Sequence, residues 1–143
     1  MKPIVLAMVI CDQYYRDAQT GKSILTGTFS SINCVRFPSK HGNCAVYIAL
    51  SDVATGGTAQ MVFKKEDGEF EMKLPPWEVK APDDRRGVVE IGGNINGLPI
   101  PEAGYYEFAF FWNDMPIASR RLKVNQVEMP QQTNNPDNEP NSD

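Results

Sequence analysis

The sequence predicts an all-β fold: an antiparallel two-sheet sandwich of about eight strands, with an immunoglobulin-like or other Greek-key arrangement. Three observations lead to this prediction. Apolar and polar residues alternate with a period of two along most of the chain, as they do in half-buried strands. Turn signals made of Gly, Pro and Asp separate these runs at short spacing. No segment of about ten residues or more has the 3.6-residue period of an amphipathic helix.

The first strands are predicted from apolar runs. The run from Pro3 to Cys11 is continuously apolar, which is typical of a strand covered on both faces. A loop is expected over residues 12–22, and alternation resumes from Ser23 to Ile32. The next strand covers residues 44–51, and one of its faces is formed by Cys44, Val46, Ile48 and Leu50.

A hairpin is predicted in the middle of the chain, because Asp67-Gly68 is the strongest hairpin signal in the sequence. Its first strand covers residues 58–66. Its second strand has an apolar face that consists of Phe70, Met72 and Leu74. Pro75-Pro76 ends this strand, because proline lacks the N–H group that a sheet ladder requires.

Three more strands complete the predicted sandwich. The first covers residues 85–96. The second is the most aromatic, and we expect one of its faces to lie in the core: Tyr106, Phe108, Phe110 and Trp112. Asn113-Asp114 turns the chain into a last strand from Ile117 to Val124, where a change of parity predicts a β-bulge near Ser119-Arg120.

The chain divides into a predicted β-sandwich domain over residues 1–124 and an acidic, Asn/Gln/Pro-rich tail over residues 125–143. The tail has no aromatic residue and too few apolar ones to offset its ordering entropy, so we expect it to be disordered. The domain has 14 basic and 14 acidic residues, and the formal net charge of −4 therefore belongs entirely to the tail. A tail of this charge favours solubility.

Composition also argues against some classes of partner and favours one cellular compartment. A mildly acidic chain without a cluster of Lys and Arg argues against nucleic-acid binding. The three Cys are odd in number and irregular in spacing, which argues against a secreted disulfide framework and favours a cytoplasmic location. The apolar run over residues 4–10 is far shorter than a membrane helix, so no membrane association is expected.

Few residues in the sequence suit catalysis or metal binding. His41 is the only histidine, and we expect it in a turn between strands, without a second group to orient it as a base. The spacings of the cysteines match no zinc motif. Calcium is the one metal left open, because loops could bring together Asp52, Asp83, Asp84 and Asp114. The sequence thus predicts no enzyme, no cofactor and no established metal site.

Five residues are candidate contacts with a partner: Trp77, Tyr14, Tyr15, Arg85 and Arg86. The three aromatic residues fall in predicted loops, and exposed Trp and Tyr commonly anchor binding surfaces. The alternative is that these rings fold back and close one end of the sandwich. The two arginines could meet acidic groups of a partner, or they could charge an edge strand against unwanted pairing, as could Arg120-Arg121.

Several short motifs occur together over nearly all of residues 1–124: Cys11-Asp12, Leu25-x-Gly27-x-Phe29, Arg36-Phe37-Pro38, Asn96-Gly97-Leu98, Pro101-x-x-Gly104-x-Tyr106-x-Phe108 and Leu122-x-Val124. In this combination they resemble an uncharacterised family of small bacterial β-sandwich proteins of unknown function, frequent in planctomycetes. The resemblance implies a small, soluble, non-secreted β-sandwich. It implies no activity and no functional residues.

We therefore expect a non-catalytic protein-binding or adaptor module whose loops or edge strands engage another protein. The first alternative is a self-assembling structural subunit that forms a homo-oligomer through its sheet edges. The second alternative is a carbohydrate-binding β-sandwich in which Trp77 and Tyr14 stack on sugar faces.

Overall fold

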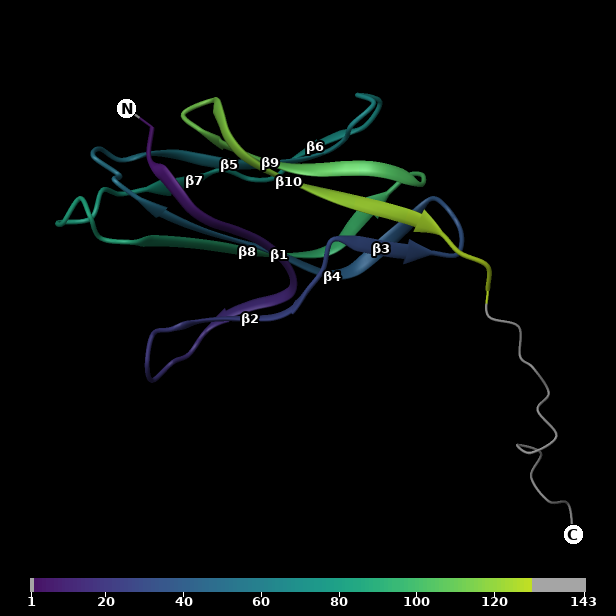
Figure 1. Ribbon diagram of the computed structural model, residues 1–143, viewed down its shortest axis with the longest axis horizontal. Helices are drawn as coiled ribbons and strands as arrows, with labels where there is room; N and C mark the ends of the chain where they lie inside the picture. Colours follow the sequence, from purple (N-terminus) through teal and green to yellow (C-terminus); the bar gives the residue numbers. More distant parts are fainter. Residues whose placement is uncertain (1, 130–143) are drawn as a thin grey trace, which may run out of the picture.

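Residues 2–129 are described by the computed structural model, and they form ten β-strands in two layers (Figure 1). Sheet A contains β1 (Ile4–Arg16), β2 (Ser23–Thr28), β4 (Ser39–Ser51) and β8 (Val89–Ile100). Sheet B contains β3 (Ser31–Cys34), β5 (Gly57–Lys65), β6 (Glu71–Lys73), β7 (Trp77–Val79), β9 (Gly104–Trp112) and β10 (Met115–Gln126). The strand orders are β2-β1-β4-β8 and β3-β10-β9-β5-β6, and β7 also pairs with β5.

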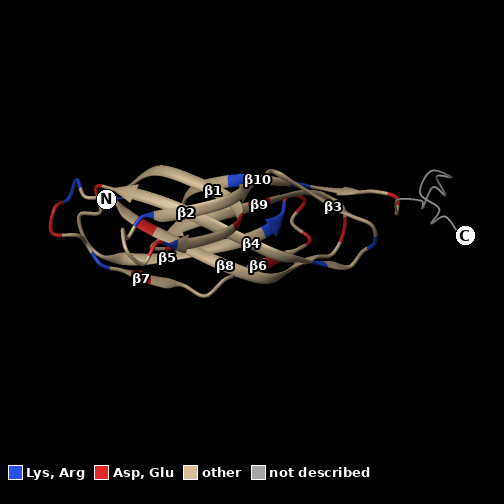
Figure 2. Cartoon of the chain, turned by 90° about the horizontal axis from the view of Figure 1, so that it is seen from below, with Lys and Arg blue, Asp and Glu red and all other residues tan. Residues whose placement is uncertain are grey.

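The predicted all-β, mainly antiparallel sandwich is confirmed. Every strand pair in the described chain is antiparallel except β3 with β10. The described residues form no helix, and so none that is long and apolar enough to cross a membrane. Charged residues gather mainly at the two ends of the sandwich and in its loops, whereas the long strands are largely uncharged (Figure 2).

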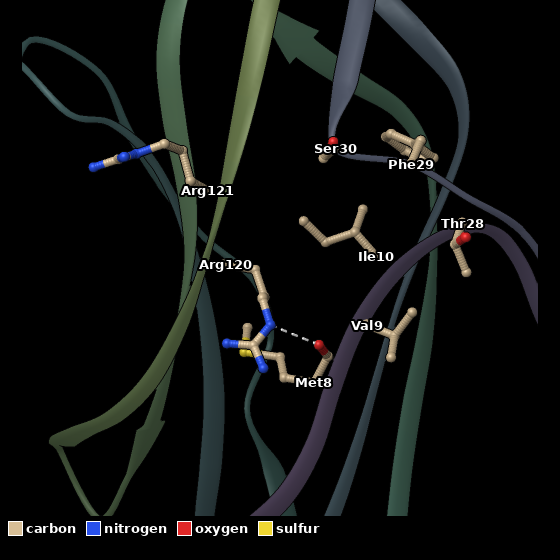
Figure 3. A pocket seen from close by; sticks show the side chains of 8 residues that line it. All are labelled: Met8, Val9, Ile10, Thr28, Phe29, Ser30, Arg120 and Arg121. Carbon is tan, nitrogen blue, oxygen red and sulfur yellow. Dashed lines mark hydrogen bonds between the residues drawn. The ribbon is translucent and has the colours of Figure 1, made fainter.

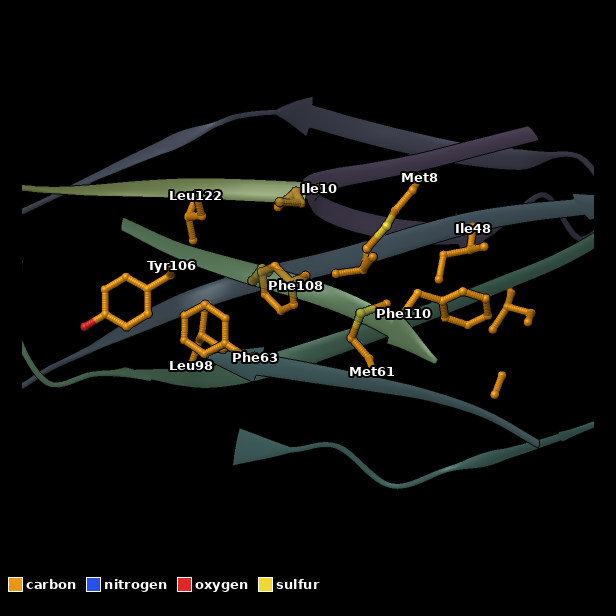
Figure 4. Packing of buried hydrophobic residues seen from close by; sticks show 14 of the residues in the cluster. Met8, Ile10, Ile48, Met61, Phe63, Leu98, Tyr106, Phe108, Phe110 and Leu122 are labelled. Atoms are coloured by element: carbon orange, nitrogen blue, oxygen red, sulfur yellow. The ribbon is translucent and has the colours of Figure 1, made fainter. Parts of the chain in front are cut away.

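The core lies between the two sheets and contains the faces that the alternation predicts (Figure 4). All four predicted core residues of β4 and all four of β9 are buried. Phe63 of β5 stacks on Tyr106 with ring centroids 5.1 Å apart, and it lies 4.8 Å from the ring of Phe108. The Tyr106 hydroxyl donates a 2.6 Å hydrogen bond to the Glu102 carbonyl, four residues upstream. This tyrosine corner ties the entry of β9 to the core.

Both predicted hairpin turns are confirmed. Strands β5 and β6 pair on either side of Asp67-Gly68, with Phe63 opposite Met72. Asn113 and Asp114 join β9 to β10 with φ values of 48° and 65°, the left-handed conformations of a tight hairpin turn.

The predicted loop over residues 12–22 is wrong for its first half, because β1 continues to Arg16. In this extension residues 13–16 pair with residues 23–26 of β2, and the side-chain amide of Asn94 in β8 also binds it. This amide accepts a 3.1 Å hydrogen bond from the Tyr14 N–H and donates a 2.9 Å bond to the Tyr14 carbonyl. These two bonds tie the second half of β1 to β8, although β4 separates the two strands in the order of the sheet.

Three other expectations need correction. The run from Ser23 to Ile32 is two strands, since β2 ends in sheet A and β3 begins in sheet B. The bulge in β10 lies between Pro116 and Ala118, slightly before the predicted position. Residues 125 and 126 belong to β10, while most of the tail predicted to be disordered lies outside the described residues.

Candidate functional site

The first half of β1 has a neighbouring strand on one side only. Residues Ile4–Cys11 pair with β4, whereas β2 joins the opposite side of β1 only from Cys11 onward. The Phe29 N–H donates to the Ile10 carbonyl over 3.2 Å at the point where β2 leaves the sheet. Within residues 2–129, no strand pairs with this side of β1 between Ile4 and Val9. Backbone groups along such an edge can pair with another chain.

Strand β10 has a free edge on the same flank of the sandwich. Strand β3 pairs only with residues 123–126 of β10, so residues 115–121 have no strand on that side in the described chain. The two free edges border a surface hollow of about 340 Å³ (Figure 3). The hollow is lined by residues 8–10 of β1, by residues 28–30 and by Arg120 and Arg121.

Arg120 connects the two sheets across this hollow. Its Nε donates a 2.9 Å hydrogen bond to the Met8 carbonyl (Figure 3). Its Nη1 donates a 2.8 Å bond to the Ser119 carbonyl. No carboxylate of the described chain forms an ion pair with it. Arg121 differs, because its Nε lies 2.6 Å from Glu66 and its guanidinium lies over the Tyr105 ring. The hydrogen bond to Met8 agrees with the predicted role of a charge that guards an edge strand.

The free edge of β1 exposes large apolar side chains. Ile4 and Leu6 are 54% and 53% exposed, so the prediction that this strand is covered on both faces is wrong. A register shift between Val5 and Ala7 leaves Leu6 outside the regular ladder. No charged residue occurs from Pro3 to Cys11. An uncharged free edge with exposed apolar residues is the kind of surface that pairs with other chains.

Trp77 lies in the short strand β7 rather than in a loop. Its ring is half-buried and covers Gly93 of β8, where an added Cβ would lie 3.0 Å from the ring. The same ring lines a hollow of about 240 Å³ between the sheets, together with Met61 and Leu74. This position agrees with the alternative that Trp77 closes the sandwich, here along the β8 edge rather than at an end.

Tyr14 and Tyr15 lie in the second half of β1, so their predicted loop position is wrong. The Tyr14 ring packs 5.7 Å from that of Tyr47 and fills the space above Gly92. Tyr14 also lines a hollow of about 440 Å³ with Trp77. Tyr15 is 48% exposed and lines a different hollow.

Arg85 and Arg86 lie in the connection between β7 and β8 rather than in a strand. Arg85 forms a 3.7 Å ion pair with Asp52, and its carbonyl accepts a 3.0 Å hydrogen bond from the Asp52 N–H. The structure therefore brings Trp77 and Tyr14 to one hollow and places these two arginines in a separate loop contact.

His41 lies in β4, and its expected position in a turn is wrong. Its ring packs 5.5 Å from that of Phe29, and its Nε2 atom is buried without a hydrogen-bond partner in the described chain. Burial raises the pKa of the Cys44 thiol to about 12 and also raises the pKa of Cys11. Both groups are therefore protonated at neutral pH, and neither is an activated nucleophile.

The aspartates proposed for calcium do not gather. In the described part of the chain, the acidic side chains close enough to share an ion are Asp67, Glu69 and Glu102. The Lys65 ammonium already pairs with Asp67 and lies 2.8 Å from Glu102. Hydrogen bonding to Lys65 lowers the pKa of Asp67.

The free edge of β1 could not have been found from the sequence alone. Residues 3–11 read equally well as a central strand with two neighbours. Only the strand order shows that β2 leaves the first half of β1 uncovered. The lack of any charge in this run was the one available signal.

Several solved structures have a similar fold. One is the sensor domain of the anti-sigma factor RsgI4 from Pseudobacteroides cellulosolvens, with 8% identity, a TM-score of 0.45, and coverage of 89% of this chain and 98% of that chain. A second is a β-glucosidase from Listeria innocua, with 7% identity, a TM-score of 0.49, and coverage of 89% of this chain and 17% of that chain. A third is the alkylpurine DNA glycosylase AlkC from Pseudomonas fluorescens, with 10% identity, a TM-score of 0.43, and coverage of 82% of this chain and 30% of that chain. At these identities the similarity concerns the fold alone.

The sequence comparisons give one match. No curated protein matches the chain at a significant level. Residues 6–125 match the profile of a family of unknown function, DUF6941. This span includes eight of the ten strands in full, and all of β1 and β10 except the first two residues of β1 and the last residue of β10. The chain therefore belongs to the DUF6941 family.

Proposed function

We propose that the chain is a non-catalytic protein-binding module that takes up an extended segment of another protein along the free edge of β1. The observation that carries this proposal is the unpaired, uncharged edge from Ile4 to Val9, on which Ile4 and Leu6 are more than half exposed. A strand added here would pair with the backbone groups of β1 that have no partner strand, would replace or share the Arg120 bond at the Met8 carbonyl, and would cover these apolar side chains.

Arg120 gives this surface a chemical preference. It is the charged group of the hollow that has no carboxylate partner within residues 2–129. A partner segment with an acidic side chain near Met8 would form an ion pair with Arg120, and this pair would favour one register of the added strand. The proposed partner is thus an extended segment with apolar residues followed or preceded by a carboxylate.

Self-assembly is the second candidate, and the composition of the edge favours it. Because residues 3–11 carry no charge, two copies of β1 could pair antiparallel about a two-fold axis without repulsion between like charges. The motif resemblance supports a bacterial origin. The three buried free cysteines support a cytoplasmic location, since disulfides are rare there.

The test compares Leu6→Lys with Val88→Lys in the full chain. Both residues are just over half exposed, but Val88 lies outside the strands. Quantitative capture from extracts of the source cells, with wild type and both variants as bait, reports partner binding. We expect Leu6→Lys to lose partners that Val88→Lys keeps. Identical captured sets for all three proteins would refute the proposal.

Size exclusion with mass detection at two concentrations separates the two candidates. A wild-type monomer, together with the loss of partners in Leu6→Lys, supports binding of another protein. A discrete wild-type oligomer that Leu6→Lys dissociates and Val88→Lys leaves intact supports self-assembly through β1.

A further inference from the structure

A polar groove lies beside the second half of β1, away from the free edge. It consists of two adjoining hollows of about 390 and 180 Å³ that share Asp12, Gln13 and Asn43. Thr26 and His41 line the larger hollow, and Tyr15 and Asn96 line the smaller one. We call this surface the amide groove. Strands β1, β2, β4 and β8 all contribute to it, so a paired sheet holds its side chains in place.

The polar side chains of the amide groove are free to bind a ligand. Within residues 2–129, the side chains of Asp12, Gln13 and Asn43 form no hydrogen bond. Asn94, at the border of the groove, differs from these three residues, because its side-chain amide is hydrogen-bonded to both the N–H and the carbonyl of Tyr14. Asp12, Gln13 and Asn43 are also exposed, so their polar groups are accessible to a ligand in the hollows that they line.

A second observation comes from His41. Its Nε2 atom is buried and has no hydrogen-bond partner in the described chain, although the residue lines the larger hollow. A buried polar atom without a partner destabilises the folded protein. A ligand in the hollow would supply the missing partner only if the His41 ring turned toward it, so His41 marks an unsatisfied polar atom at this site.

Gly27 lies beside Asp12, one of the residues that line the amide groove. Its φ of 66° is left-handed, and a Cβ at this position would lie 2.2 Å from the Asp12 carboxylate oxygen. Glycine therefore makes room for this carboxylate beside β2. Asp12 of the motif Cys11-Asp12 and Gly27 of the motif Leu25-x-Gly27-x-Phe29 thus meet beside the groove, whereas Phe29 of the second motif lies at the hollow of the β1 edge.

The lining residues indicate the chemistry of the ligand. Amides and the Thr26 hydroxyl both donate and accept hydrogen bonds, which suits hydroxyl groups, since these also do both. No lysine or arginine lines either hollow, so a phosphate or another strong anion would have no countercharge. Tyr15 presents an exposed ring at the groove, on which the apolar face of a sugar could rest.

We propose that the amide groove binds a neutral saccharide, with Asp12, Gln13 and Asn43 hydrogen-bonded to its hydroxyl groups and Tyr15 against its ring. This site differs from the Trp77–Tyr14 pair expected from the sequence, whose rings pack against Gly93 and Gly92. It is also independent of the proposed protein-binding edge of β1.

The test is an NMR titration of the uniformly ¹⁵N-labelled full chain. The probes are the neutral trisaccharides of glucose, mannose, galactose and N-acetylglucosamine, each added to tens of millimolar. We expect at least one of them to give saturable shifts that centre on residues 12–15, 41–43 and 94–96. The absence of a saturable shift with all four probes would overturn the proposal.

Substitutions in the amide groove test whether the saccharide binds there. Gln13→Ala and Asn43→Ala should each weaken binding about five- to tenfold, since each removes hydrogen bonds to the ligand. Gln19→Ala is the matched control, because Gln19 is exposed in the turn after β1 and its side chain has no partner in the described chain. Saccharide binding that Trp77→Phe abolishes and that Asn43→Ala leaves unchanged would also overturn the proposal.

Discussion

Two glycines of sheet A are required because neighbouring side chains occupy the space where a Cβ would lie. At Gly92 the intruding group is the Tyr14 ring, 2.2 Å from the added atom. At Gly93 it is the Trp77 ring at 3.0 Å. Two of the three aromatic residues that the sequence indicated, Tyr14 and Trp77, thus pack against one short segment of β8. Their main role in the described chain is to cover this strand, whatever else they contact.

Gly92→Ala is expected to lower the free energy of unfolding by about 1–3 kcal/mol, since the methyl group overpacks the site and displaces Tyr14 from Tyr47. Denaturant titration followed by tyrosine and tryptophan fluorescence measures this loss. Gly42→Ala is the control, because an added Cβ there meets no atom within 4 Å. It should be neutral or slightly stabilising. An equal loss in both variants would contradict the assigned contact.

At the scale of the strands, the side-chain alternation predicted the faces well and the connections poorly. The core faces of β4 and β9 and the turns at Asp67-Gly68 and Asn113-Asp114 depend on local signals, and the structure confirms them. The extension of β1 pairs with β2 and is also bonded to Asn94, 80 residues away, a contact that no local sequence pattern indicates. The crossing from β2 to β3 also escaped prediction, because alternation does not say which sheet a strand joins.

The same limit applies to the candidate sites. Trp77 and Tyr14 were chosen as exposed loop residues, and the structure brings them to one hollow as half-buried strand residues. Of the amide groove the sequence indicated only Tyr15, since the residues of the groove come from four strands and have no shared spacing in the sequence. Chemistry that depends on strand order is visible only once the strand order is known.

Arg120 of β10 joins two strands, because it is hydrogen-bonded to the Met8 carbonyl of β1. Arg120→Ala is expected to destabilise the fold by about 1–2 kcal/mol, because it leaves the Met8 carbonyl without its charged donor. It should also increase self-association, since it removes the charge that guards the β1 edge. Thermal unfolding and sedimentation velocity measure the two effects.

The neighbouring arginine provides the control for this prediction. Arg121→Ala removes an exposed ion pair with Glu66, and such pairs contribute about 0–1 kcal/mol. We expect it to change neither stability nor sedimentation appreciably. Equal behaviour of the two variants would show that the contact with Met8 does not stabilise this flank.

At the scale of the whole molecule, the distribution of charge bears on the exposed edge. The sandwich has no net charge and presents an uncharged free strand, a combination that favours association. The net charge of −4 belongs to the last 19 residues, namely to Glu128, Asp137, Glu139 and Asp143. These residues are therefore expected to keep copies of the chain apart through their charge.

Neutralising the tail tests this expectation without shortening the chain. The fourfold variant Glu128→Gln, Asp137→Asn, Glu139→Gln and Asp143→Asn should have a lower solubility limit near pH 7 and a higher average mass in sedimentation, because repulsion between copies is lost. Adding Leu6→Lys to this variant should restore the monomer, since it charges the free edge of β1. A neutral tail that leaves mass and solubility unchanged would refute this role. Association that persists despite Leu6→Lys would mean that the copies meet on a surface other than the first half of β1.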